Sequence, residues 1–320
     1  MGGSSLSKFL EDTQYLLGVD FVQDALVACA LLGILSGVMT SLIVLRQMSF
    51  SVHATSELAL MGAAAALLFG LNIGFGAIAG AIVAAIILAV LGLKGQQDSA
   101  IGVVMSFGLG LSVLFLHLYP GNANTAMTLL TGQIVGVSSA SVWLLAATTV
   151  IIVAAVTILW RPLLFASADP VMAQAAGVPV KALSVVFAVL VGLTAAQSVQ
   201  IVGSLLVMAL LITPGAAAVQ ITSSPLRAVV WATIFAEVSA VGGFLLSLAP
   251  GLPVSVFVTS ISFVIYLVCR GIGWARSRKA VRDDVAARRA SQEHFRAATN
   301  RADAEAHHTS THDEHCAHQD

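Results

Sequence analysis

The stretch Asp169-Pro170-Val171-Met172-Ala173-Gln174-Ala175-Ala176-Gly177-Val178 interrupts a chain that is otherwise almost continuously apolar. It follows one apolar span and leads into two more, which end near Ile212-Thr213-Pro214-Gly215-Ala216. Asp169 stands where an N-cap residue accepts backbone amide protons, and Pro170 suits the first turn of a helix. The stretch is therefore predicted to be a short capped helix between membrane spans.

The composition of the chain is that of a protein that lies in lipid. Hydrophobic residues make up 58% of the 320 residues, charged residues only 10%, and the mean hydropathy is +0.94. A membrane-spanning helix needs roughly 20 apolar residues. We predict an all-α polytopic membrane protein with nine spans, or eight if the pair around Val199 is one broken helix. The nine spans are 21–45, 52–70, 73–93, 100–118, 137–160, 182–199, 201–222, 227–248 and 254–272.

The positions of Lys and Arg orient these spans. The loops 70–73, 118–136, 199–201 and 248–254 contain neither residue. By the positive-inside rule, the opposite side is cytoplasmic. We therefore expect the N-terminus outside and the C-terminus in the cytoplasm, which requires an odd number of spans; Lys8 disagrees. The basic residues of the cytoplasmic side are Arg46, Lys94, Arg161, Lys181, Arg227 and a cluster that begins at Arg270.

The chain divides into a short N-terminal segment, 1–20, a transmembrane domain, 21–272, and a basic, His-rich tail, 273–320. The basic part of the tail is expected to lie along membrane lipid. Imidazoles on a flexible chain are good zinc ligands, so the tail is a candidate metal buffer or sensor, or else a terminus without such a role. The tail candidates are His307, His308, His312, His315, Cys316 and His318.

Ionisable side chains inside the predicted spans are costly and usually functional. His53 and Glu57 are four residues apart, so they project from the same helix face and can bind one divalent cation together. Alternatively, they form a buried hydrogen bond with each other. Glu237, in the eighth span, either lines a pathway or bonds across helices. His117, near the outer end of the fourth span, is a weaker candidate for metal entry.

Seven segments follow one another along the chain: Leu45–Phe50, His53–Gly62, Asp98–Gly102, Trp160–Leu164, Asp169–Pro179, Gly203–Val207 and Ile212–Pro214. Taken in this order, they resemble the zinc/manganese ABC permease family of the ZnuB type. The resemblance covers roughly residues 21–272. It implies a homodimer in the bacterial plasma membrane, a separate ATP-binding cassette subunit and an extracytoplasmic metal-binding protein. It also implies that 161–181 is the segment that couples to the ATPase, with Asp169, Pro170, Gln174 and Gly177.

One departure from the family pattern lies in the second span. The family usually has Gly-Asp-Ala, a variable residue, then Ser-His-Ala, and its Asp and His are thought to line the metal path. In this chain those positions are His53 and Glu57, and Met61 replaces a proline. The carboxylate and the imidazole have exchanged places, so the ligand types are kept. A two-fold axis would then supply four nitrogen and oxygen ligands.

The sequence therefore predicts the permease of an ATP-driven importer of divalent metal, with Zn²⁺ preferred because of the tail and Mn²⁺ or Fe²⁺ as the alternative. It is not expected to be an enzyme, to hold a permanent cofactor or to bind nucleic acid. No GxxxxGK[ST] phosphate loop is present, so ATP hydrolysis belongs to a partner. A gradient-driven carrier is a second alternative, and an intramembrane metalloenzyme is disfavoured because no HExxH pattern occurs.

Overall fold

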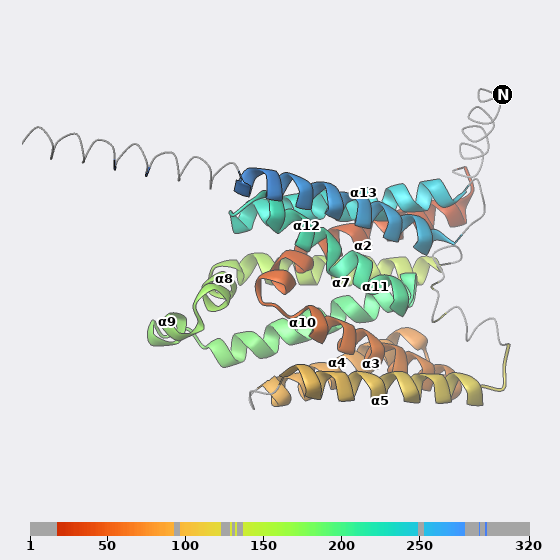
Figure 1. Cartoon of the computed structure of the whole chain (residues 1–320). Coiled ribbons are helices and arrows are strands. Elements are labelled where there is room, and N and C mark those ends of the chain that lie inside the picture. The colour runs from red at the N-terminus through yellow and green to blue at the C-terminus, as the bar shows by residue number, and fades with distance from the viewer. Residues whose placement is uncertain are drawn as a thin grey trace, which may run out of the picture. The chain divides into compact units, whose positions relative to one another are not determined.

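The computed structural model describes residues 18–92, 97–122, 137–248 and 253–278, together with Leu129, Gly132, Arg288 and Gln292. Regular structure in these residues is helical (Figure 1). Residues up to Arg270 form one compact unit and those from Gly271 a second. The helices are α2 Asp20–Leu45, α3 Ser49–Leu68, α4 Ile73–Gly92, α5 Gln97–Leu118, α7 Ser139–Ile158, α8 Trp160–Ala168, α9 Pro170–Ala175, α10 Val180–Val202, α11 Ser204–Leu211, α12 Thr213–Ile221, α13 Pro225–Leu248 and a last helix Val254–Arg278.

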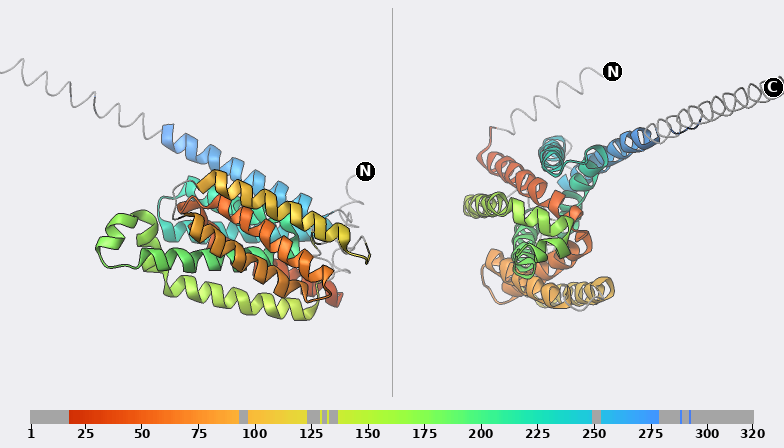
Figure 2. Two further views of the ribbon diagram at one scale, coloured as in Figure 1. Left: turned by 90° about the horizontal axis from the view of Figure 1, so that it is seen from below. Right: turned by 90° about the vertical axis from the view of Figure 1, so that its left-hand side faces the viewer.

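The helices of the first unit run side by side as a bundle (Figures 1 and 2). In the part of the chain that the structure describes, seven helices are long and apolar enough to cross a membrane. Two shorter apolar segments, Ile73–Leu88 and Leu206–Ile221, fall where two more spans are predicted. The polytopic all-α class is thus confirmed, whereas nine spans and the orientation of the termini stay predictions.

The segment after α10 differs from the expected turn at 199–201. Helix α10 continues to Val202 and ends at Gly203. Gly203 has a φ of 76°, a conformation that glycine adopts easily because it has no Cβ. The predicted span 201–222 is itself divided at Ile212, between α11 and α12. The Thr40 hydroxyl of α2 donates to the Ile212 carbonyl, at 3.3 Å, and accepts from the Gly215 amide, at 3.1 Å. The Ile212 carbonyl also accepts from the Ala216 amide, so the group that the division leaves free and that Thr40 satisfies is the Gly215 amide in the first turn of α12.

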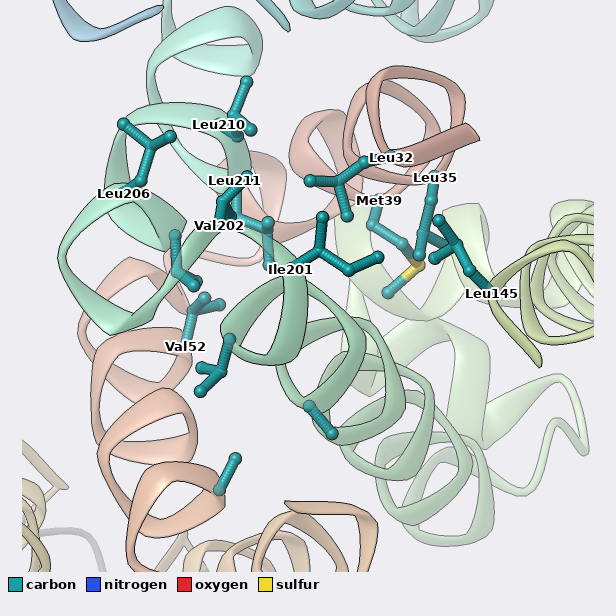
Figure 3. Packing of buried hydrophobic residues seen from close by; sticks show 14 of the residues in the cluster. Leu32, Leu35, Met39, Val52, Leu145, Ile201, Val202, Leu206, Leu210 and Leu211 are labelled. Carbon is teal, nitrogen blue, oxygen red and sulfur yellow. The ribbon is translucent and has the colours of Figure 1, made fainter. Parts of the chain in front are cut away.

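The core of this unit lies where α2, α7, α10 and α11 meet. Figure 3 shows apolar side chains of α2 gathered with those of the α10–α11 junction and with Leu145 of α7. Lipid tails are as apolar as these side chains, so close packing rather than exclusion from water stabilises such contacts. The labelled core residues are Leu32, Leu35, Met39, Val52, Leu145, Ile201, Val202, Leu206, Leu210 and Leu211.

Candidate functional site

Helix α3, which carries the predicted metal pair, is packed against α4 through glycine. A Cβ at Gly62 would lie 2.2 Å from the Gly76 carbonyl oxygen, and one at Gly80 would lie 2.2 Å from the Leu58 carbonyl oxygen. Only the lack of side chains allows the two backbones to approach this closely. On another face of α3, Leu58 packs on Gly108 of α5. These contacts hold α3 between two neighbours.

His53 and Glu57 lie one turn apart near the N-terminal end of α3. Glu57 is only 5% exposed, and His53 is half-buried. Among the described residues, neither Nδ1 of His53 nor Oε2 of Glu57 has a hydrogen-bond partner, although both atoms are buried. The predicted alternative, in which the two groups merely satisfy each other, leaves these atoms unexplained. A buried polar atom without a partner is costly. Several other buried polar atoms of the described residues also lack partners, so it is the adjacent imidazole and carboxylate, both metal-ligating groups, that make this pair the candidate metal site.

The other polar side chains around this pair are satisfied by backbone. The Thr55 hydroxyl donates to the Ser51 carbonyl at 2.7 Å, and the Ser56 hydroxyl donates to the His53 carbonyl at 2.8 Å. The Ser112 hydroxyl of α5 donates to the Gly108 carbonyl at 2.7 Å. Each of these hydroxyl protons has a backbone acceptor, whereas the buried Nδ1 of His53 and Oε2 of Glu57 have no partner among the described residues.

The weaker candidates lie elsewhere. The Glu237 carboxyl of α13 packs on α2, where a Cβ at Gly33 would lie 2.8 Å from its Cδ. His117 is exposed in the last turn of α5. Within the described residues, no three His, Cys, Asp or Glu side chains form a group that could hold a metal ion. One subunit therefore offers the two groups of α3. The predicted tail ligands, His307 to His318, lie outside the described residues.

The predicted capped helix is confirmed as α9. The Asp169 carboxylate accepts from the amides of Val171, at 3.1 Å, and Met172, at 2.9 Å, and Pro170 begins the helix. At the other end, Gly177 has a φ of 84°, and the Gly177 and Val178 amides donate back into α9, which closes it by a Schellman motif. The segment is thus a compact helix with both ends satisfied.

The free face of α9 is partly apolar. Val171 is 77% exposed and Met172 59% exposed, and Gln174 is also exposed, while Ala173 is buried. Helices α8 and α9 lie together at one end of the bundle (Figure 1, left). Val171 and Met172 are neighbours on a helix at the end of the bundle, so this face of α9 is a candidate docking surface.

Arg46 was considered above only for the orientation of the chain and the family resemblance, but its side chain is embedded between helices. Its Nε donates to Ser167 Oγ at 2.7 Å, and its Nη2 donates to the Leu163 carbonyl at 3.3 Å, both in α8. The guanidinium also stands over the Phe187 ring of α10, 4.4 Å from its centroid. Burial lowers the pKa of Arg46 from its ordinary value, but a guanidinium stays charged at neutral pH. In the sequence, the sign of this half-buried arginine is a single basic residue directly after an apolar span.

Seven apolar helices of spanning length among the described residues indicate a multi-pass membrane protein, and the candidate metal pair and the capped helix α9 are both compatible with a transport permease. The family described as "ABC 3 transport family" matches residues 18–271. The chain belongs to this family of metal ABC permeases and is a multi-pass protein of the bacterial cytoplasmic membrane.

Named relatives agree with this assignment. The "Manganese transport system membrane protein MntC" of Listeria monocytogenes is 31% identical over 274 residues, which are 83% of this chain and 98% of that protein. The "Manganese import system permease protein ScaB" of Streptococcus parasanguinis is 34% identical over 62% of this chain and 71% of that protein. The solved structure of PsaBC from Streptococcus pneumoniae in complex with Fab matches with a TM-score of 0.74 and 26% identity, covering 82% of this chain and 95% of that one.

Proposed function

We propose that this chain is the permease subunit of an ATP-driven importer of a divalent transition-metal ion. It acts as a homodimer with a separate ATP-binding subunit and an extracytoplasmic metal-binding protein. The observation that carries the proposal is the buried His53–Glu57 pair, whose Nδ1 and Oε2 atoms lack partners among the described residues. Two copies would supply two imidazoles and two carboxylates around one ion.

Manganese is the first ion to test, and zinc, which the sequence favours, is the second. The two relatives named above carry manganese in their names, which supports Mn²⁺ here as well. Carboxylates suit Mn²⁺ and imidazoles suit Zn²⁺ or Fe²⁺, so a mixed ligand set accepts either. Intrinsic affinity at nitrogen and oxygen sites favours Zn²⁺ over Mn²⁺. Selection of manganese would therefore depend on site geometry and on the protein that delivers the ion.

The ATPase is proposed to dock on α9 and to move the permease through it. Asp169 and Pro170 keep the helix compact, so a push on its exposed face moves the helix as one body. The exposed Val171 and Met172 side chains would be buried against the partner. ATP-driven movement of this segment would then expose the metal pair alternately to the two sides of the membrane.

The test is uptake of radioactive Mn²⁺ by cells that lack their own manganese importer and express this chain with its ATPase and binding protein. We expect uptake to require an active ATPase subunit and to fall at least about 100-fold in His53→Ala/Glu57→Ala, beyond the usual cost of losing outer-shell metal partners. Thr55→Ala/Ser56→Ala is the matched control, since it removes two polar groups from the same helix turns. Competition by Zn²⁺ ranks the two ions.

Two results would contradict the proposal. Uptake that continues with an inactive ATPase would identify a gradient-driven carrier. Undiminished uptake by the double alanine variant would show that the ion passes elsewhere. Stronger competition by Zn²⁺ than by unlabelled Mn²⁺ would restore zinc as the preferred cargo without altering the class of transporter.

A further inference from the structure

We propose that Arg46 is a positioning residue that transmits movement of the α8–α9 segment to the helix carrying His53 and Glu57. This inference rests on the proposed function, because it explains how the ATPase end of the permease reaches the metal pair. It assigns a role in transport to a residue that touches neither the ion nor the free face of α9.

The guanidinium of Arg46 contacts the helices on both sides of α9. Its two hydrogen bonds go to Ser167 Oγ and to the Leu163 carbonyl in α8. Ser167 lies only two residues before Asp169, the cap of α9. The Phe187 ring beneath the guanidinium belongs to α10, the helix after α9, and is fully buried. A shift of α9 relative to the bundle therefore displaces groups that Arg46 holds.

The backbone that connects Arg46 to α3 is also held by hydrogen bonds. The Gln47 amide donates to the Val44 carbonyl and the Met48 amide to the Ile43 carbonyl, both at 3.0 Å, which is the Schellman pattern. Gln47 has a φ of 54°, a left-handed conformation that usually falls to glycine. The connection from α2 to α3 is thus a tight turn, not a slack loop.

Helix α3 starts directly after this turn. It begins at Ser49, so His53 lies about 6 Å further along its axis and Glu57 about 12 Å. A displacement of Arg46 would reach the metal pair through little more than two helical turns. Such a displacement would therefore act on α3 through this turn, and not through the middle of α3 in the membrane.

The geometry requires arginine rather than a positive charge alone. Nε and Nη2 donate in two fixed directions while the planar group lies on an aromatic ring. Lysine has a compact ammonium on a flexible stem and reproduces neither the paired donors nor the stacking. Arg46→Lys therefore keeps the charge and removes the linkage. Arg227, which is exposed in the first turn of α13, is the matched position for Arg→Lys.

The experiment measures how many Mn²⁺ ions are moved for each ATP hydrolysed, in proteoliposomes that contain the permease, its ATP-binding subunit and the binding protein. We expect Arg46→Lys to lower this ratio about tenfold, the scale of one hydrogen bond to a charged group. Ser167→Ala should lower the ratio about threefold, and the double variant should be no worse than Arg46→Lys, because both changes break one linkage. Arg227→Lys should leave it unchanged.

An unchanged ratio in Arg46→Lys overturns the inference. So does an equal fall of ATP hydrolysis and uptake together with a lower Tm, because that pattern marks a purely structural residue. If Arg46→Lys does not assemble, Ser167→Ala decides by the same ratio. Failure of the proposed function is distinguishable, because the wild-type complex would then show no ATP-dependent Mn²⁺ uptake at all, and the inference would fall with it.

Discussion

Two glutamates in membrane helices, Glu57 of α3 and Glu237 of α13, have different surroundings. Each has one buried carboxylate oxygen without a partner among the described residues. Glu57 has an imidazole one turn away on its own helix. Glu237 packs on Gly33 of α2. The buried Cys29 thiol lies one turn before Gly33 and interacts electrostatically with Glu237, so each carboxylate has a second group nearby. The comparison teaches that the two sites differ in the kind and placement of that second group: an imidazole on the same helix for Glu57, and a thiol on another helix for Glu237.

The largest expected effect comes from removing the charge of Glu57 without changing its shape. Glu57→Gln should reduce Mn²⁺ uptake about 100-fold, since an amide is a much weaker ligand for a divalent cation than a carboxylate. The measurement is the initial uptake rate per folded permease, with Tm as the check on folding. Near-normal uptake would show that Glu57 does not bind the ion and so would contradict the proposed difference between Glu57 and Glu237.

The second prediction concerns the α2–α13 interface on which Glu237 lies. A Cβ at Gly37 would lie 2.3 Å from Thr233 Cα, a backbone atom that cannot yield, whereas a Cβ at Gly33 meets the movable end of Glu237. Gly37→Ala should therefore destabilise the permease by about 2 kcal/mol, and Gly33→Ala by clearly less. Thermal unfolding in one detergent compares the two variants. Equal losses would show that the Glu237 side chain is as fixed as backbone.

The third prediction tests the N-terminal cap of α9. Asp169→Ala removes the side chain that accepts from the Val171 and Met172 amides. The loss of such a cap costs about 1 kcal/mol locally. We expect weaker binding of the ATPase subunit, measured by co-purification, with Mn²⁺ binding by the permease unchanged. Asp169→Asn, which can still cap, should bind the ATPase like the wild type.

The smallest effect is expected at Glu237. Glu237→Gln keeps the shape that packs on Gly33, so uptake should change by less than about twofold. Uptake and Tm are measured beside Glu57→Gln. A loss as large as that of Glu57→Gln would place Glu237 in the metal pathway, as the sequence allowed.

Features that depend on local sequence could be predicted, and features that depend on distant contacts could not. The polytopic all-α class and the Asp169–Pro170 cap follow from composition and residue type alone, and the structure confirms both, with seven helices of spanning length among the described residues. The division at Ile212 could not be located, because the Gly215 amide that it leaves free donates to Thr40, 175 residues away. Arg46 could be recognised as basic, but its contacts with α8 and α10 exist only after folding.

The candidate site was predictable to the same extent. The four-residue spacing of His53 and Glu57 placed both on one face of a helix. Sequence could not show that their Nδ1 and Oε2 atoms lack partners, because this depends on how Ser112 and the glycines of α4 pack around α3. Nor could it separate Glu237 from this pair, since that separation depends on which helices are neighbours.

The most direct test of the central claim is Mn²⁺ binding to the purified permease dimer in lipid nanodiscs, followed by electron paramagnetic resonance of the free ion. We predict that the wild-type dimer and Thr55→Ala/Ser56→Ala remove free Mn²⁺ from solution, whereas His53→Ala/Glu57→Ala does not. Equal binding by the double alanine variant would contradict the account, because the pair in α3 would then not be the site that holds the ion.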